Sequence, residues 1–441
     1  MSRWISEKLS HPKWQGLRSM GVIVAIILGI YVAWVTVFTP KISARFHYQN
    51  GSTNFDQGNY TQAIEDYIQA IKFDPVFTDA YYKRGQVFYQ KGNYTQAIED
   101  YTQAIELGPQ SAHTYVDRGD SYYQVHKYTQ AVEDYTKALE LTPSKEIRSD
   151  TYIKRGLAFF ENDNYTQAIS DYTQAIELES NSVSAYVNRG SAYREAGQYV
   201  QAFEDYAKAI KLKPDSEFAY FNRGLAHYKK GEYAQAVKDY TQAIQLEPGF
   251  TNYVHRGLAY FRQDNYARAI DDYTEAIKYP NADIATAHVF LGNAYSAEGN
   301  YAQAIEEHTQ AIQLQQLDPD SVTYVNRGNA YYRSGKYVQA FEDYAKAIQL
   351  EPDFDYAYFR RGLAYYEEGN YVQAVKDYTQ AITLSPKGNY YYYRGLAYLE
   401  YQDVQNKANG IKDLNKVMNI STDSDLRTRT MKKLEEIRFL P

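Results

Sequence analysis

One fifteen-residue segment recurs along most of the sequence. NYTQAIEDYTQAIEL runs from Asn93 to Leu107, and NYTQAISDYTQAIEL, with one letter changed, runs from Asn164 to Leu178. Glycines keep the same register, and successive ones are separated by 33 to 37 residues. They are Gly51, Gly85, Gly119, Gly156, Gly190, Gly224, Gly257, Gly292, Gly328, Gly362 and Gly395. A regular period of this length predicts an array of stacked repeats rather than one globular core.

Each repeat has the pattern of two helices. Tyr94, Ala97, Ile98, Tyr101 and their successors fall on one face of a helix, with polar residues opposite. A proline closes this second helix in most repeats, and Gly-Asn pairs mark the turn before it. The central glycine lies inside the first helix, where it costs about 1 kcal/mol relative to alanine. We therefore expect close approach of the partner helix at that glycine.

These residues resemble the tetratricopeptide repeat (TPR) family. One repeat carries the family pattern of a large aromatic, glycine, alternating aromatics and alanines, and a closing proline. The matching residues are Tyr220, Gly224, Tyr233, Ala236, Tyr240, Ala243 and Pro248. The resemblance covers roughly residues 44–420. It implies an all-α, right-handed α-superhelical solenoid of about eleven helical hairpins, whose first helices line a concave groove that binds peptides or proteins.

Charged residues also follow the repeat. Arginine precedes most of the central glycines, and aspartate follows fifteen residues later in most repeats, as in Asp100 and Asp205. We expect an Arg–Asp contact between helices, within a repeat or between neighbours; the alternative is two independently solvated charges. The repeat around Gly292 departs from the pattern, with Leu291 for arginine, Glu307 for aspartate, and His288 and His308 at tyrosine positions. Both histidines are expected to pack in the core rather than bind a ligand.

The two ends of the chain differ from the array. The last repeat is expected to lengthen its first helix by about three residues, over 399–407, and residues 425–439 read as an amphipathic capping helix, which solenoid ends need. Near the start, residues 21–38 carry no charge, and as a helix they would span roughly 27 Å. We expect an uncleaved transmembrane helix over 21–39; the alternative is a cleaved signal peptide. The predicted parts are a basic tail (1–20), the transmembrane helix (21–39), the array (44–420) and the cap with its tail (421–441).

Charge sets the expected orientation and excludes one class of partner. Residues 1–45 hold six basic residues and one acidic, whereas the rest hold 41 basic and 53 acidic. More of the basic residues near the span precede it, which favours a cytoplasmic N-terminus and an array on the extracytoplasmic (periplasmic or lumenal) side. An acidic array argues against nucleic-acid binding, which needs a basic surface. The chain has no cysteine, so thiolate metal sites and cysteine nucleophiles are excluded.

No catalytic constellation is found, so we predict a protein that is not an enzyme and that uses no cofactor or metal. In the TPR family, groove positions fall two residues before the central glycine and one, four and five after it. Carried over to this sequence, the resemblance implies a peptide- or protein-binding groove at twelve residues. They are Lys83, Tyr89, Tyr123, Lys154, Asn188, Asn222, Tyr228, His255, Asn326, Tyr332, Arg360 and Tyr366.

The function expected from these features is a membrane-anchored scaffold or adaptor that takes part in complex assembly. Its groove would bind peptide or protein partners, hydrogen-bonding their backbone through Asn and Lys and stacking side chains on Tyr. The alternative is a glycan-binding or enzyme-accessory module in which the tyrosines stack on sugars. A further alternative is that these residues only solvate a groove filled by water or by the chain's own helices.

Overall fold

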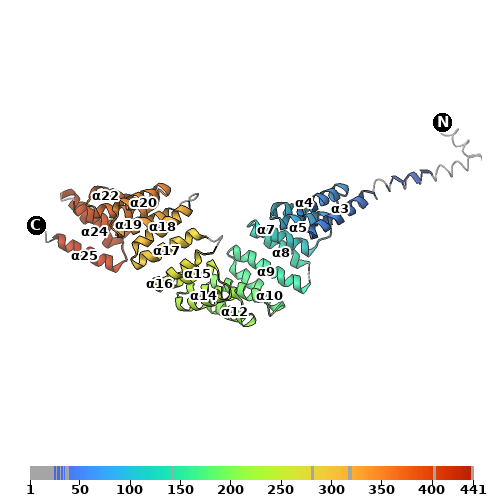
Figure 1. Ribbon diagram of the computed structural model, residues 1–441, viewed down its shortest axis with the longest axis horizontal. Helices are drawn as coiled ribbons and strands as arrows, with labels where there is room; N and C mark the ends of the chain where they lie inside the picture. The colour runs from blue at the N-terminus through green and yellow to red at the C-terminus, as the bar shows by residue number, and fades with distance from the viewer. Residues whose placement is uncertain are drawn as a thin grey trace, which may run out of the picture. The chain divides into compact units, whose positions relative to one another are not determined.

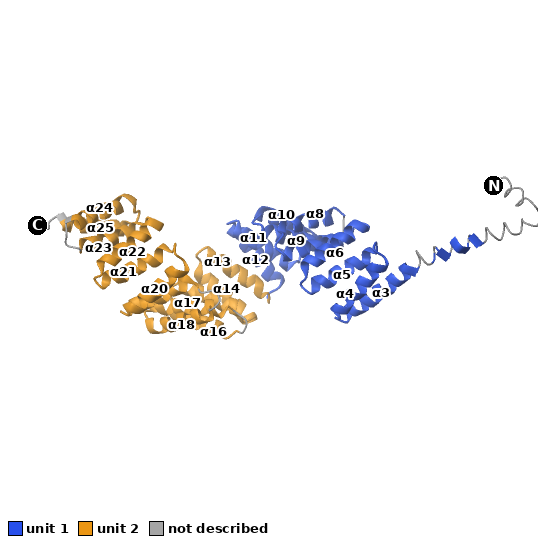
Figure 2. Ribbon diagram, turned by 90° about the horizontal axis from the view of Figure 1, so that it is seen from above, with its two compact units in different colours: residues 1–214 blue, residues 215–441 orange. Residues whose placement is uncertain are grey.

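The computed structural model describes residues 39–141, 144–279, 283–315, 320–400 and 404–438, together with eight residues between Val24 and Trp34. Every regular element in these ranges is a helix, and no strand occurs among them (Figure 1). Eleven helical pairs follow one another, and a single helix ends the series. The chain divides into two compact units, unit 1 (residues 1–214) and unit 2 (residues 215–441), shown in separate colours in Figure 2.

The helices of unit 1 are α3 (Thr39–Asp56), α4 (Tyr60–Phe73), α5 (Thr78–Gln90), α6 (Tyr94–Leu107), α7 (Ala112–Gln124), α8 (Tyr128–Glu140), α9 (Lys145–Glu161), α10 (Tyr165–Leu178), α11 (Val183–Glu195) and α12 (Tyr199–Leu212). Those of unit 2 are α13 (Glu217–Lys229), α14 (Tyr233–Leu246), α15 (Phe250–Phe261), α16 (Tyr266–Ala276), α17 (Ile284–Glu298), α18 (Tyr301–Leu314), α19 (Ser321–Arg333), α20 (Tyr337–Leu350), α21 (Asp355–Glu367), α22 (Tyr371–Leu384), α23 (Gly388–Leu399), α24 (Val404–Ile420) and α25 (Ser424–Arg438). Odd-numbered helices from α3 to α23 are the first helices of repeats, and their even-numbered partners are the second.

The core of each repeat is a tyrosine pressed against the central glycine. Tyr101 of α6 is 1% exposed, and a Cβ added to Gly85 would lie 2.8 Å from its Cε1 atom. The corresponding distance is 2.6–2.9 Å in the other repeats that have this tyrosine. Ala97 and Ala104 flank the ring and are almost fully buried. The expected close approach at the glycine is therefore confirmed, because any side chain there would overpack the helix pair.

The turn between the two helices needs a left-handed residue. Glycine supplies it in most repeats, as at Gly92, where φ is +76°. His126, Asp163 and Asp264 take this position elsewhere, each with φ of 57°. Each of the three is hydrogen-bonded to the tyrosine two residues later, at 2.6–2.7 Å. This local bond offsets part of the cost that a left-handed conformation imposes on a residue with a Cβ.

The Arg–Asp contact is confirmed, and it joins the two helices of one repeat wherever arginine precedes the central glycine. In α5 and α6, Arg84 donates from Nε and Nη2 to both carboxylate oxygens of Asp100, at 2.8 and 2.6 Å. In the next repeat, Arg118 makes the same bidentate bond to Asp134 and also donates from Nη1 to Thr102 of the preceding repeat, at 3.0 Å. The guanidinium thus fixes its own helix pair and ties it to its neighbour.

The last repeat corrects one expectation. The first helix, α23, ends at Leu399, and the second helix, α24, is the longer one, with 17 residues. Arg394 accordingly bonds to Asp413, nineteen positions on instead of sixteen, and Leu414 takes the place of tyrosine against Gly395. The three additional residues therefore shift the contacts by almost one turn along α24.

The remaining expectations concern the two ends. Helix α25 contacts α24 and α23 and buries Leu426 and Ile437, while Lys432, Glu435 and Glu436 stay exposed. Its role as a cap stays a prediction. Within the ranges that the structure describes, no helix is both long and apolar enough to cross a membrane. Most of the expected span, residues 21–39, lies outside those ranges, as do all of residues 1–20.

Candidate binding surface

The first helices form one continuous side of each compact unit. Successive first helices contact each other, as in α5 with α7, α7 with α9, and α19 with α21. Second helices, in the described part of each unit, make their extensive contacts only with the first helices before and after them. We define the first-helix face as the surface formed by three positions of each first helix. These positions are two residues before the central glycine, one residue after it and four residues after it.

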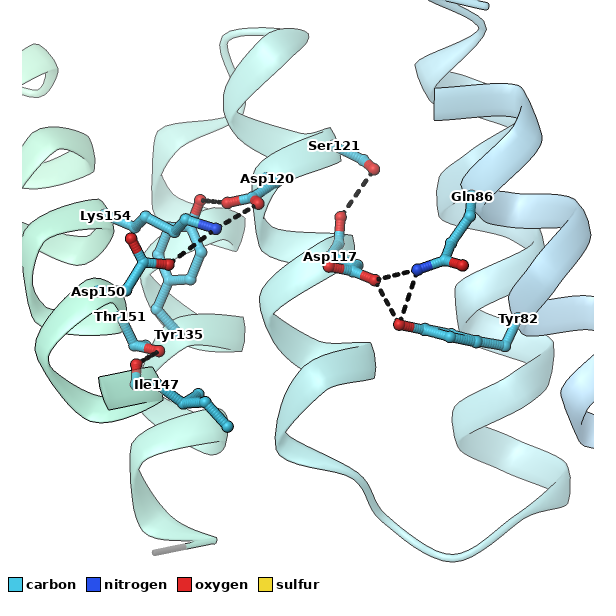
Figure 3. Close-up of polar contacts among 10 residues, drawn as sticks. All are labelled: Tyr82, Gln86, Asp117, Asp120, Ser121, Tyr135, Ile147, Asp150, Thr151 and Lys154. Carbon is cyan, nitrogen blue, oxygen red and sulfur yellow. Dashed lines mark hydrogen bonds and ion pairs between the residues drawn. The ribbon is translucent and has the colours of Figure 1, made fainter. Parts of the chain in front are cut away.

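Polar side chains link neighbouring first helices across this face. In unit 1, the Tyr82 hydroxyl donates to Asp117 at 2.8 Å, and Lys154 bonds to Asp120 at 2.7 Å. Figure 3 shows both contacts in a row that crosses α5, α7 and α9. In unit 2, Arg360 of α21 donates to Asn329 of α19 at 2.5 Å. In each unit, side-chain hydrogen bonds therefore link the first helices of neighbouring repeats.

The tyrosines predicted for the groove share one environment. The position four after the glycine is only partly exposed in each case, and its ring meets, edge-on, the first tyrosine of the following helix at 5.3–5.6 Å. These residues are Tyr89, Tyr123, Tyr228, Tyr332 and Tyr366. Burial raises the pKa of Tyr332 and of Tyr366 to about 12, so both stay neutral donors at physiological pH.

The residues predicted two positions before the glycine are more varied. Asn222 is buried and donates to the Phe218 carbonyl, so little of it is available to a partner. His255 lies edge-on to Phe221, with ring centroids 4.9 Å apart, and burial lowers its pKa, which keeps it neutral. The others in this set are partly exposed: Lys83, Lys154, Asn188, Asn326 and Arg360.

The structure brings only some of the predicted residues together. Arg360 lies over the Tyr332 ring, 5.4 Å from its centroid, which is the geometry of a cation–π contact. Asp120 connects two other predicted residues. It forms a salt bridge with Lys154, and it lines the same cavity as Tyr89. Lys83 bonds to Gln86 of its own helix, and Tyr228 accepts from Arg262, the residue that follows α15.

That cavity lies on the first-helix face of unit 1. It measures about 180 Å³ and is lined by residues of α3, α5, α6 and α7: Phe55, Gln86, Tyr89, Gln90, Tyr101, Asp117 and Asp120. Of these, only Tyr89 belongs to the predicted set. The positions expected to line the groove, applied in full, also indicate five other lining residues: Phe55, Gln86, Gln90, Asp117 and Asp120. Nothing in the repeat pattern indicated that Tyr101 would reach a cavity.

A second hollow lies on unit 2 at the start of α13 and α15. It measures about 320 Å³ and is lined by Glu217, Phe218, Phe221, Glu247, Gly249, Phe250, Thr251 and Asn252. Like the cavity in unit 1, it combines two carboxylates with aromatic rings. Among the described residues, no cluster of His, Asp or Glu has the arrangement of a metal site. The face is thus suited to hydrogen bonding, stacking and charge recognition.

Comparison with known families agrees with the repeat architecture. A TPR repeat model matches residues 51–92, 85–126, 156–195, 190–231 and 328–369. Three tetratricopeptide repeat models match 218–250 and 356–387, 254–322, and 112–145. Together the matches take in 51–145, 156–250, 254–322 and 328–387, which is more than half of the chain. No curated protein matches the sequence.

Several solved structures share the helical-repeat fold. A tetratricopeptide repeat protein from Parabacteroides merdae is 21% identical, with 57% of this chain and 98% of that chain covered and a TM-score of 0.48. The APC/C hetero-tetramer Cut9–Hcn1 is 13% identical, with 89% and 96% covered and a TM-score of 0.43. Yeast Tom70 is 16% identical, with 88% and 99% covered and a TM-score of 0.38. The repeat matches, rather than these distant likenesses, carry the assignment: the chain belongs to the tetratricopeptide repeat family.

Proposed function

We propose that this protein is a membrane-anchored scaffold that binds peptide or protein partners along the first-helix face of a right-handed TPR superhelix. The observation that carries the proposal is the chemistry of that face. It offers half-buried tyrosines, amides and charged groups in a row, repeated at the spacing of the helices. An extended peptide can use such a row, with its backbone bonded to amides and its side chains between rings.

The anchor is proposed for residues 21–39, with the N-terminus in the cytoplasm and the array on the extracytoplasmic side. The described apolar side chains of this stretch support it, because Ile27, Leu28 and Trp34 are all more than half exposed. Apolar groups of this size are stabilised by transfer out of water, and a bilayer provides such a medium. Tethering would confine a long recognition surface to the membrane.

Binding can be tested with the full chain in detergent micelles and a library of random dodecapeptides on beads. The triple variant Asn188→Ala, Tyr228→Ala and Asn326→Ala removes predicted face residues that are not buried. We expect bead capture to fall about tenfold or more, because a few well-placed residues dominate most interfaces. Helicity measured by circular dichroism should be unchanged.

The matched control changes Val200 and Val338 to serine. Both lie on second helices and are 70% and 64% exposed, so they probe the opposite side of the repeats. Their substitution should leave capture unchanged. The same protein on a glycan array tests the alternative function, since sugar binding without peptide capture would replace the scaffold proposal.

Orientation needs its own experiment. Protease added to sealed membranes, with the extracytoplasmic side outward, should digest the array and leave the N-terminal tail intact. Protection of the array in those membranes, with digestion only in inverted ones, would reverse the proposed topology. Recovery of the full chain in the soluble fraction would remove the anchor from the proposal.

A further inference from the structure

The cavity in unit 1 has the size of a side-chain subsite. A volume of about 180 Å³ is far larger than the ~10–15 Å³ that one water needs. It is also smaller than the ~300–1,000 Å³ typical of pockets for whole small molecules. Its walls come from three successive first helices, α3, α5 and α7, and from Tyr101 of α6. One long side chain of a ligand that lies along the first-helix face would fit there.

The charge in the cavity is negative and incompletely neutralised. Asp117 and Asp120 lie three residues apart on α7, and both line the cavity. Asp120 bonds to Lys154 at 2.7 Å and to the Tyr135 hydroxyl at 2.7 Å. Among the described residues, the Asp117 carboxylate is hydrogen-bonded only to neutral groups, the Tyr82 hydroxyl and the Gln86 amide (Figure 3), at 2.8 and 3.4 Å. Burial raises the pKa of the Asp117 carboxyl and the nearby Asp120 charge adds to the rise, so the Tyr82 and Gln86 hydrogen bonds and the Lys154 charge offset only part of the lost hydration.

The hydroxyl of Tyr101 provides a second, independent observation that points to a ligand in the cavity. Tyr101 is 1% exposed and lines the cavity, yet its hydroxyl bonds to no described residue. The equivalent tyrosines of the two neighbouring repeats do have partners. Tyr67 bonds to Ser52 at 3.2 Å, and Tyr135 donates to Asp120 at 2.7 Å. A ligand that supplies a polar atom in the cavity would therefore give this hydroxyl a hydrogen-bond partner.

We propose that this cavity binds the side chain of a lysine or arginine of the partner, with Asp117 as the charged acceptor and the Tyr101 hydroxyl as a further hydrogen-bonding group. The inference rests on the proposed function, because it names one subsite of the peptide-binding face. The rings of Phe55 and Tyr89 line the same space. They suit the methylene stem of such a side chain, and aromatic rings also attract cations.

The sequence supplies the substitution that tests this subsite. Asp117 stands two residues before Gly119, and the same position holds asparagine at 188, 222 and 326. Asp117→Asn therefore removes the charge with a residue that this fold already accepts there. Tyr101→Phe removes only the hydroxyl and keeps the ring that packs on Gly85.

The experiment measures fluorescence anisotropy of labelled nonapeptide pools with the full chain in detergent micelles. The central residue is fixed as Lys, Arg, norleucine or Glu, and the flanks are randomised among neutral residues. The Lys and Arg pools should bind about tenfold or more tightly than the norleucine pool, which has a similar stem without charge. Asp117→Asn should reduce this ratio to about twofold or less, and Tyr101→Phe should reduce it to an intermediate value.

Two controls separate the subsite from general effects. Glu99→Gln removes one negative charge at an exposed position of α6 and should leave the ratio unchanged. Tyr172→Phe removes a buried hydroxyl that also lacks a partner but lies outside the cavity, and it should have no effect on the ratio. Equal ratios in Asp117→Asn and Glu99→Gln would overturn the inference.

The failure of this inference is distinguishable from failure of the proposed function. Four pools that bind equally well would overturn the cationic subsite and leave peptide binding intact. Four pools that do not bind at all would overturn the proposed function, and this subsite with it. If Asp117→Asn lowers the melting temperature, Tyr101→Phe decides alone, and an unchanged ratio in that variant counts against the assignment.

Discussion

Two neighbouring repeats of unit 2 solve the same packing problem with different residues. The Gly328 repeat (α19 and α20) has the common set, in which Arg327 forms a bidentate bond with Asp343, at 2.8 and 2.7 Å. The Gly292 repeat (α17 and α18) has leucine in place of that arginine. There His288, at the tyrosine position, bonds to Glu307 at 2.6 Å. The partner of the carboxylate, His288, lies one helical turn before Leu291 on the first helix. The carboxylate belongs to Glu307, whose side chain is one methylene longer than that of aspartate.

The two repeats differ more at the ring against the central glycine. Tyr344 packs on Gly328 and donates its hydroxyl to Asn329 at 2.9 Å. His308 packs on Gly292, and a Cβ at that glycine would lie 2.7 Å from its ring. His308 is fully buried, and neither ring nitrogen has a hydrogen-bond partner among the described residues. The Gly292 repeat therefore keeps the shape of the common core but carries unsatisfied polar atoms.

The repeats of this chain therefore keep the same contacts while the residue types that form them differ. Leu291, Glu307 and His288 form a consistent set, since each change fits the other two. His308 is the exception, and we expect it to make this repeat the less stable of the two. The predictions below test that difference.

The largest difference is expected when the core ring is removed. Tyr344→Ala should lower the local free energy of unfolding of α20 by about 3–5 kcal/mol, because it deletes a fully buried aromatic side chain. His308→Ala should cost α18 only about 1–2 kcal/mol, since the lost ring also carried two unsatisfied nitrogens. Native-state hydrogen exchange measures each helix separately. Equal losses would show that His308 stabilises its repeat as well as tyrosine does.

The ion pairs should differ next. Asp343→Asn leaves the Arg327 guanidinium, whose side chain is only 17% exposed, without its counter-charge, and should cost about 3 kcal/mol. Glu307→Gln should cost about 1 kcal/mol, because the glutamine amide can still form a hydrogen bond with the His288 ring. The urea midpoint of each variant checks the order. A larger loss from Glu307→Gln would contradict it.

Acid should weaken the Gly292 repeat selectively. Burial lowers the pKa of His308 to about 4, and the nearby Arg327 charge acts in the same direction. An unfolded histidine titrates near 6.5, so between these values the unfolded state binds more protons, and stability falls as pH falls. From pH 7 to pH 5 we expect a loss of about 2 kcal/mol in α18, from ~1.4 kcal/mol per pH unit. His308→Phe should abolish this loss.

The smallest effect concerns the contact between repeats. Arg327 donates to Thr309 of the preceding repeat at 3.1 Å, whereas the matching residue before Arg361 is Ala345. Ala345→Thr would give Arg361 that acceptor, and we expect a gain of about 0.5 kcal/mol after the lower helix propensity of threonine. A small rise in the urea midpoint is the measurement. A fall would show that the threonine bond adds nothing to the ion pair.

Sequence reasoning was sufficient for the repeats and insufficient for the contacts between them. The glycine register and the apolar spacing fix the helices, because both act within one helix pair. The Arg–Asp contact was predictable for the same reason, since it lies within a repeat. Where the additional residues of the last repeat would go was predicted wrongly, because either helix accommodates one further turn and only packing against α23 decides.

The candidate site was less predictable. Tyr89 and Lys154 were identified by position, but the burial of Asn222 depends on how α13 packs, and the cavity beside Asp117 depends on how α3, α5 and α7 pack. Asp120 shows the limit: its place one residue after Gly119 suggests the face, yet its pairing with Lys154 joins residues 34 positions apart in the sequence. Contacts between repeats vary with each side chain, so the repeat pattern alone does not contain them.

The central claim is that partners bind the first-helix face. Its most direct test places a photo-crosslinking phenylalanine analogue at Tyr228 or Tyr366, on that face, and at Val200 or Val338, on the exposed side of second helices, in the full chain. After irradiation with a bound library peptide, mass spectrometry reports which sites are joined to it. We predict crosslinks from Tyr228 and Tyr366 and none from the two valine positions. Crosslinks from the valine positions alone would contradict the claim.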